Sequence, residues 1–250
     1  MMKKRTMLVL VAALFVLTAA LLIGLFLSDG EQGGQGGITL PAQGGADIDP
    51  TPDIGKDNAG RVAEITVDRT NVQRVVASMS RPAQYSYVAR AIYAYEGGTT
   101  ALETRGWVRA DLCLVRQYDG EGDLRAQSVL SKSNVYLWGG EGDAFYQGRP
   151  GDLTADQMGR LPTYEDVLSL PEDEILEGAV KDWNGRACIY VRSGALRKYT
   201  DWYVSLDNGL LLWAGETEGE KQVYSVTLEA MTVADIPDET FLLPNGAMPE

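Results

Sequence analysis

Residues 199–244, YTDWYVSLDNGLLLWAGETEGEKQVYSVTLEAMTVADIPDETFLLP, predict the fold of the chain. Apolar and polar residues alternate there as they do in half-buried strands, so we expect antiparallel strands over 202–206, 210–217 and 222–232. Asp207-Asn208-Gly209 separates the first two and predicts a turn with two residues at positive φ. In the third strand we expect one face to carry Tyr224, Val226, Leu228 and Ala230.

A sheet that ends in this way needs further strands, and the preceding sequence contains them. Short alternating runs separated by glycine-rich turns predict strands over 84–95, 100–109, 112–118, 124–130, 134–138 and 144–148. A further hairpin is expected over 174–183 and 186–192, turning at Asn184-Gly185. This regular spacing predicts an antiparallel sheet that is large enough to curl.

Few helices are expected beside this sheet. Over 71–80, apolar residues recur at i, i+3, i+4 and i+7 (Val72, Val75, Val76 and Met79), with Asp68 or Thr70 as the expected cap and Pro82 as the stop. A short strand is expected just before, over 62–67. Helical pieces over 154–159 and 164–170, the second capped by Thr163, are expected in the middle of the chain.

The terminal stretch resembles the lipoprotein-carrier (LolA/RseB-like) superfamily. The matching residues are Trp202, Asp207, Gly209, Leu210, Asp238, Phe241, Leu243 and Pro244. The resemblance implies an α+β, mainly β fold: an open half-barrel of antiparallel strands with a short N-terminal helix and a mid-chain helical insertion on its concave side. It also implies a hydrophobic guest on the concave face, and the order of elements extends it to about residues 62–245.

The N-terminal quarter predicts a membrane tether. Residues 1–6 are basic, and residues 7–27 are apolar without a charge and would span about 30 Å as a helix. A cleaved signal peptide is the alternative, but its apolar core is usually shorter. We therefore expect a single-pass anchor with the N-terminus in the cytoplasm. Residues 28–60 read as a flexible Gly/Pro-rich linker, and 61–250 as the extracytoplasmic domain.

The charge of the chain excludes some partners. It carries 22 basic and 35 acidic residues, a net charge of −13, and three of the basic residues precede the apolar run. An acidic surface of this kind does not suit nucleic acid, whose phosphates require cations. It also disfavours binding flat on anionic lipid.

The residue inventory argues against catalysis. The chain has no histidine, the commonest general base and zinc ligand. The two cysteines, Cys113 and Cys188, lack the spacing of a redox motif or zinc ribbon. Outside the cytoplasm they would either form a disulfide or remain as buried thiols, and the sequence leaves both open. We expect no enzyme activity, no cofactor and no metal.

Two acidic patterns have a simple structural interpretation. Asp119, Glu121 and Asp123 alternate like the start of a calcium loop, but leucines (Leu124 and Leu130) occupy its sixth and twelfth positions, which favours a hairpin turn. Carboxylates follow Pro171 at Glu172, Asp173, Glu174 and Glu177. No apolar pocket is evident to raise the pKa of one of them for glycosidase chemistry, so a solvated loop is favoured.

The candidate ligand-binding residues are apolar. A cavity for an acyl chain or an apolar peptide would be lined by Val72, Val76, Met79, Trp107, Trp138, Trp202 and Trp213. An ordinary sheet core is the alternative for the same residues.

Two functions are consistent with this sequence. The first is a membrane-tethered module that holds a lipid, a lipoprotein acyl chain or an apolar peptide in a half-barrel. The second is an accessory subunit of an envelope, sporulation, germination or stress-sensing complex, acting by contact with an envelope protein. The missing lipidation cysteine favours a Gram-positive cell.

Overall fold

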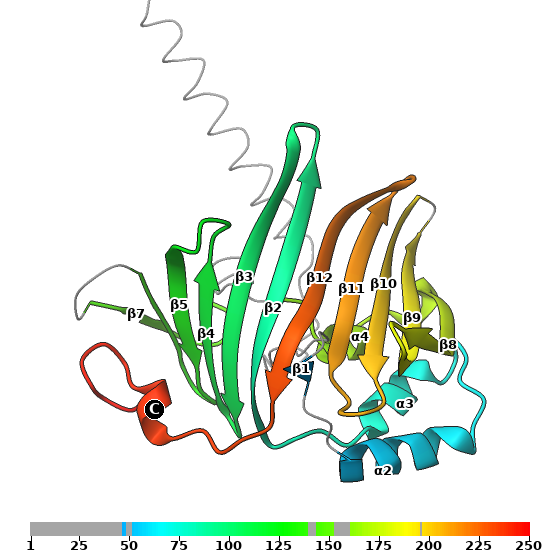
Figure 1. Ribbon diagram of the computed structural model, residues 1–250, viewed down its shortest axis with the longest axis horizontal. Helices are drawn as coiled ribbons and strands as arrows, with labels where there is room; N and C mark the ends of the chain where they lie inside the picture. Colours follow the sequence, from blue (N-terminus) through cyan, green and yellow to red (C-terminus); the bar gives the residue numbers. More distant parts are fainter. Residues whose placement is uncertain (1–46, 49–51, 140–143, 153–160, 196) are drawn as a thin grey trace, which may run out of the picture. The chain divides into compact units, whose positions relative to one another are not determined.

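The computed structural model describes residues 47–48, 52–139, 144–152, 161–195 and 197–250. Twelve strands form one sheet (Figure 1). They are β1 (Asp47–Ile48), β2 (Gln84–Tyr95), β3 (Gly98–Arg109), β4 (Leu112–Tyr118), β5 (Leu124–Leu130), β6 (Val135–Trp138), β7 (Tyr146–Gly148), β8 (Ile175–Trp183), β9 (Arg186–Ala195), β10 (Lys198–Ser205), β11 (Leu211–Glu218) and β12 (Lys221–Thr232). The helices are α2 (Pro52–Ala63), α3 (Val72–Ser78), α4 (Tyr164–Leu168) and the 3₁₀ helices η1 (Glu172–Glu174) and η2 (Asp238–Phe241).

The sheet is antiparallel and does not close. Its order is β7-β6-β5-β4-β3-β2-β12-β11-β10-β9-β8, so β7 and β8 are its edges. Strand β12 pairs with β2 and joins the two halves of the meander, while β1 pairs with β12 in parallel at one end. The expectation of a mainly β fold with one large open antiparallel sheet and few helices is therefore confirmed.

The N-terminal part of the described chain differs from the prediction. Helix α2 ends at Ala63, and no strand forms over 62–67. The buried amide of Asn58 donates to the carbonyl oxygens of Ser80 and Leu206, at 3.1 Å each, and accepts from the Ser80 amide at 2.7 Å. These contacts hold the helix, so ordered structure extends into the region 52–60 that composition marked as linker.

The apolar run 7–27 and residues 28–46 lie outside the described residues, as does the expected helix over 154–159. None of the helices that the structure does describe is long and apolar enough to cross a bilayer.

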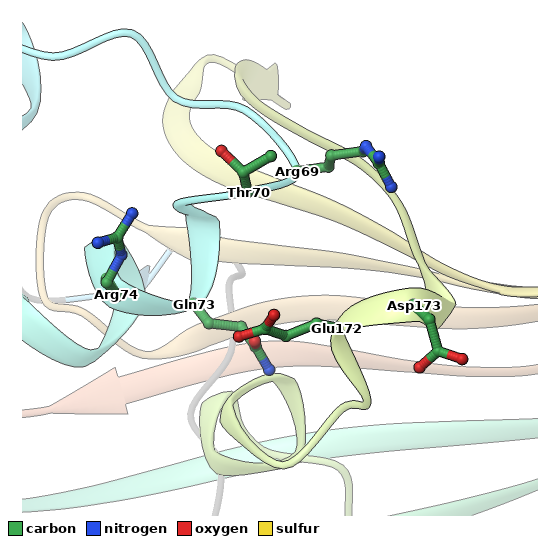
Figure 2. Close-up of a pocket in the computed structure, with 6 residues that line it drawn as sticks. All are labelled: Arg69, Thr70, Gln73, Arg74, Glu172 and Asp173. Atoms are coloured by element: carbon green, nitrogen blue, oxygen red, sulfur yellow. The ribbon is translucent and has the colours of Figure 1, made fainter.

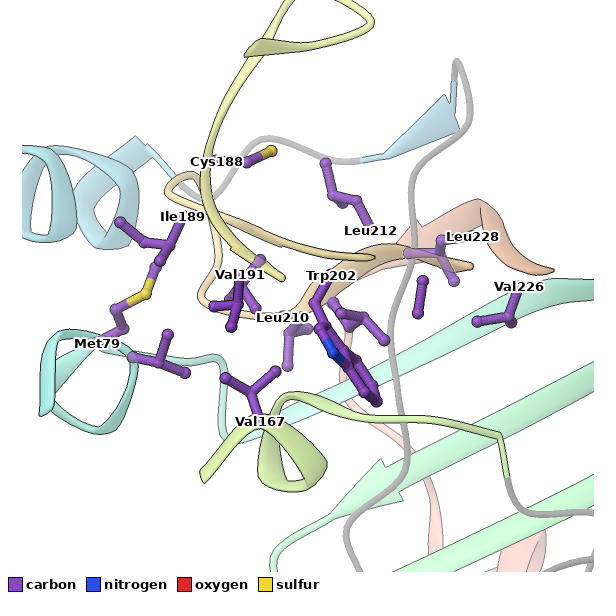
Figure 3. Packing of buried hydrophobic residues seen from close by; sticks show 14 of the residues in the cluster. Met79, Val167, Cys188, Ile189, Val191, Trp202, Leu210, Leu212, Val226 and Leu228 are labelled. Carbon is purple, nitrogen blue, oxygen red and sulfur yellow. The ribbon is translucent and has the colours of Figure 1, made fainter. Parts of the chain in front are cut away.

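Strand alternation gives the sheet two distinct faces. On the first, which we call the helix-bearing face, Tyr85, Tyr87, Ala89 and Trp202 pack in one cluster with α3 and α4. Figure 3 shows Met79, which directly follows α3, and Val167 of α4 reaching toward the sheet residues of this cluster. On the opposite, outer face, Leu114, Val129 and Tyr136 pack against the C-terminal segment through Ile236, Phe241 and Leu243.

A β-bulge at Glu229 changes which side chains of β12 reach the core. Leu228 pairs with Ala89 and Ala230 with Val88, so Glu229 has no partner in the register. As a result Met231, rather than Ala230, joins Tyr224, Val226 and Leu228 on the helix-bearing face. The expected placement of Ala230 is wrong for this reason.

Local signals predicted the two helices well. Val72, Val75 and Val76 in α3 and Met79 directly after it are all buried as expected. The expected cap, Asp68 or Thr70, was wrong, because Asn71 holds the cap position, without a side-chain cap hydrogen bond. In α4, the Thr163 hydroxyl accepts from the Glu165 amide at 3.0 Å, and Asp166 accepts from the Thr163 amide at 2.6 Å. This is the reciprocal capping pair that favours a helix start.

The two Asn-Gly turns differ. Asn184 and Gly185 both have positive φ, 50° and 82°, as a tight two-residue hairpin requires. In the β10–β11 turn only Gly209 does, at 72°. Here the buried Asn208 side chain accepts from the Leu210 amide at 3.0 Å, and the Gly209 amide donates to Ser205 at 2.9 Å. The longer connection needs a single left-handed residue, so the expectation of two was wrong.

The cysteines do not form a disulfide. Cys113 in β4 and Cys188 in β9 are both buried and free. Five strands separate them in the sheet, which at about 4.8 Å per strand puts them far beyond the roughly 7 Å between Cα atoms that a disulfide allows.

We expect both thiols to be inert in the folded chain. Burial raises the pKa of Cys188 to about 12 and that of Cys113 well above its ordinary value. Thiol titration of the native full-length protein at pH 8 should therefore be slow, whereas both groups should react at once in denaturant. An introduced surface thiol, Ser133→Cys, should react quickly in the native state. If the mass of the intact protein before reduction is two hydrogens below its mass after reduction, a disulfide is present and this account is contradicted.

The same shift has a consequence for stability. An unfolded cysteine ionises near pH 8.5, whereas Cys188 in the folded chain stays protonated until about 12. Its contribution to the free energy of unfolding is therefore complete below about pH 8.5 and declines as pH rises toward 12. Replacing Cys188 with alanine should flatten this alkaline decline in urea unfolding measured across that range, and an unchanged slope would contradict it.

Candidate functional site

A groove opens on the helix-bearing face where the α4–η1 connection meets the β9–β10 hairpin. Its volume is about 360 Å³, within the usual range of small-molecule sites. Its lining combines apolar and hydroxyl-bearing side chains from two distant segments of the chain: Leu170, Glu174, Ser193, Gly194, Ala195, Lys198, Tyr199, Thr200 and Trp202.

Trp202 marks the inner end of this groove. It lies in β10 between Val191 of β9 and Ala214 of β11, and only 7% of it is exposed. Its indole Nε1 donates to the Ser193 hydroxyl at 3.1 Å. The hydrogen bond satisfies the polar atom of the ring and fixes its orientation, which leaves an apolar surface at the boundary between closed core and groove.

The outer end of the groove is tight and charged. Gly194 has a φ of 132°, and a Cβ there would meet the Lys198 carbonyl oxygen, so the hairpin requires glycine. The Lys198 ammonium pairs with Glu216 at 2.8 Å and is exposed. The groove therefore combines an apolar inner end with two charged lining residues, Glu174 and Lys198, and the ammonium of Lys198 is already paired with Glu216.

Arg81 positions the helices that wall this face. Its guanidinium donates to three carbonyl oxygens: Gly209 at 2.9 Å, Met79 at 2.8 Å and Val76 at 2.6 Å. It also stacks on Tyr164 of α4, 3.6 Å from the ring centroid. Burial lowers the pKa of Arg81 from its ordinary value, but that value is so high that we treat the side chain as charged. One side chain thus joins α3, α4 and the β10–β11 turn.

The structure separates the seven predicted ligand-binding residues. Val72, Val76 and Met79 are enclosed between α3 and the sheet and do not line the groove. Trp202 does line it. Trp107 and Trp138 lie on the outer face beside the C-terminal segment. Trp213 is also on the outer face, stacked on Trp183 with ring centroids 4.8 Å apart.

Strand parity explains this separation. Trp202 of β10 pairs with Ala214 of β11, so these two side chains share the helix-bearing face. Trp213 directly precedes Ala214 in β11 and therefore points to the opposite face. The remaining groove residues, among them Leu170 and Thr200, carried no sequence signal. They meet only because the α4–η1 connection packs over the β9–β10 hairpin.

The outer face of β9 and β10 carries a network of charged and hydroxyl-bearing side chains. Asp201 accepts from the Arg192 guanidinium at 2.7 and 3.0 Å and from the Tyr190 hydroxyl at 2.5 Å. Burial, and then this hydrogen bond, raise the pKa of Tyr190, while the bond to Asp201 raises that of Arg192. Each donor is paired, so the cluster is a structural brace of the sheet.

The acidic patterns fit their structural interpretation. The Asp119 carboxylate accepts from the amides of Glu121 and Asp123, at 3.0 Å each, and closes the hairpin turn. Glu172, Asp173 and Glu174 form η1 and are exposed. The described residues contain no cluster of side chains suited to a metal ion.

Comparison with known proteins gives only distant similarities. No family model and no curated protein matches the chain. Among solved structures, a MucA/MucB complex from Pseudomonas aeruginosa is 16% identical, with 74% of this chain and 59% of that chain covered and a TM-score of 0.40. An uncharacterised conserved protein from Thermus thermophilus is 8% identical, with 73% and 91% covered and a TM-score of 0.42.

A LolA superfamily protein from Nitrosomonas europaea is 8% identical, with 71% and 97% covered and a TM-score of 0.36. LolA-superfamily and MucB-containing structures are thus among the similar ones, and the chain spans about three fifths of the MucA/MucB chain that it matches.

We expect Arg81 to be among the residues on which stability depends most. Replacing it with alanine leaves three carbonyls without their charged donor and removes the stack on Tyr164, which should cost about 2–4 kcal/mol of unfolding free energy. Arg90, which is exposed, is the matched control, and its alanine variant should change that free energy by less than about 0.5 kcal/mol. Urea unfolding followed by circular dichroism measures both, and equal effects would contradict the role of Arg81.

Proposed function

We propose that this chain is a non-catalytic, membrane-tethered, extracytoplasmic binding module. Its helix-bearing face holds the acyl chain of a lipid or lipoprotein, or a similar apolar segment. The apolar run 7–27 would anchor it in the cytoplasmic membrane, with the folded part outside, as in a Gram-positive cell. The single observation that carries the ligand proposal is the groove that ends on Trp202.

The groove supports this function through its size and its chemistry. About 360 Å³ beside an oriented indole accommodates several methylene groups, each of which contributes about 0.8 kcal/mol when it is buried. The closed part of the same face, beneath α3, is already filled by the chain's own side chains. A ligand would therefore occupy the outer part of the face and leave the core intact.

A groove-filling substitution tests this proposal. Thr200 lines the groove on β10, and a tryptophan there should occupy the space of the ligand. The full-length protein should bind a fluorescent fatty-acid probe that an unlabelled fatty acid displaces. In Thr200→Trp the affinity should fall about tenfold or more, a loss of about 1.4 kcal/mol.

The matched control lies on the other face of the same sheet. Thr227 of β12 is also a half-buried threonine in an inner strand, but it pairs with Trp213 on the outer face. The Thr227→Trp variant should bind the probe as the parent does. Equal losses in both variants, or no displaceable binding at micromolar probe, would contradict the proposal.

A second function, contact with an envelope protein partner, is favoured by the edge strand β8. Strand β8 ends the sheet order, and two of its aliphatic side chains, Leu176 and Val180, are 50% and 48% exposed. An exposed edge with apolar side chains is able to pair with a strand of another protein.

Crosslinking in the parent membrane tests this second function. The full-length chain should capture a defined membrane protein, and Val180→Asp should lose it because a charge is then placed on the apolar edge. Ile92 of β2 is 39% exposed but lies in an inner strand, so Ile92→Asp should retain the partner. Recovery of the same abundant proteins with the parent, Val180→Asp and Ile92→Asp would count against this function.

A further inference from the structure

A second cavity, separate from the groove in its lining residues, lies between α3 and η1. Its volume is about 580 Å³, and every side chain that lines it is polar: Arg69, Thr70, Gln73, Arg74, Glu172 and Asp173 (Figure 2). Figure 2 shows the two arginines on the α3 side and the two carboxylates on the η1 side. The cavity thus has a cationic wall and an anionic wall.

These four charges do not neutralise one another. Within the described residues, the ion pairs at 4 Å or less include none of Arg69, Arg74, Glu172 and Asp173.

Gln73 anchors the segment that leads to the anionic wall. Its side-chain amide donates to the carbonyl oxygens of Val167, Leu168 and Leu170, at 3.0, 3.2 and 2.8 Å. These bonds fix the end of α4 to α3, and Pro171, which directly follows this anchored segment, restricts the backbone that leads into η1. The two elements that carry the charged walls, α3 and η1, are therefore positioned by contacts within the chain itself.

From this geometry we propose that the cavity is a binding site for a zwitterion that carries a phosphodiester and a primary amine. Two positive and two negative side chains sum to zero, so a ligand of no net charge with two separated charges matches both walls. Guanidinium groups suit the oxygens of a phosphate. A primary ammonium donates hydrogen bonds to carboxylates such as those of Glu172 and Asp173.

The lining also discriminates between amines. None of the six lining residues is aromatic, and quaternary ammonium groups are usually recognised by aromatic rings. The site should therefore prefer an ethanolamine head group to a choline head group. This inference goes beyond the proposed function, because the groove and this cavity share no lining residue.

Titration of the full-length protein, held in amphipol, with glycerophosphoethanolamine tests the proposal. We expect saturable binding that is about threefold or more tighter than binding of glycerophosphocholine, ethanolamine or glycerophosphate, in keeping with the modest energies of exposed ion pairs. Triglycine, a zwitterion without a phosphodiester, should bind more weakly. Glycerophosphoethanolamine binding no tighter than glycerophosphocholine or triglycine would overturn the proposal.

Variants of the two walls should have different effects. Arg74→Gln should weaken both glycerophospho ligands, whereas Glu172→Gln should weaken only the ethanolamine ligand and so remove the preference over choline. Arg90→Gln and Glu229→Gln change exposed charges elsewhere and should leave binding unchanged. Parent-like binding in both wall variants would overturn the assignment.

The source of the head group is distinguished by a short-chain phosphatidylethanolamine. Tighter binding than the glycerophospho compound, with the excess lost in Thr200→Trp, would identify a lipid that uses both sites. Equal binding would identify a free zwitterion. If the parent protein binds the fatty-acid probe but not the zwitterion, this inference alone is rejected. If it binds the zwitterion but not the fatty-acid probe, only the proposed function is rejected.

Discussion

The interactions of Arg81 constrain how the rest of the helix-bearing face is arranged. The side chain links the C-terminal end of α3, the β10–β11 turn and Tyr164 of α4 through three carbonyl oxygens and one ring. A Cβ on Gly209 would meet the Ser80 carbonyl oxygen and the Arg81 side chain, so this close approach depends on glycine. Because α4 is held in this way, the connection that follows it reaches both cavities.

That connection contributes lining residues to both cavities. Leu170 and Glu174 line the apolar groove, while Glu172 and Asp173 line the polar cavity. A five-residue segment therefore contributes to an apolar site and to a charged one. Its position is set from both directions, by Gln73 on α3 and by Arg81 through Tyr164.

Local patterns in the sequence predicted the strands and hairpins because alternation and turn chemistry are properties of neighbouring residues. They failed where tertiary contacts decide. Helix α2 contains Gly55 and Gly60 in a glycine-rich context, but Asn58 holds it through buried hydrogen bonds. The bulge at Glu229 changed the parity of β12 without a sequence signal.

The site was less predictable than the fold. Of the seven candidate residues, only Trp202 lines a described cavity on the helix-bearing face. Trp107 lines a smaller cavity of about 110 Å³, which lies on the outer face.

The five tryptophans provide the most direct measurement. With fluorotryptophan in the full-length chain, a fatty acid should shift the ¹⁹F resonance of Trp202 and leave Trp107, Trp138, Trp183 and Trp213 in place. Shifts confined to those four would contradict binding on the helix-bearing face.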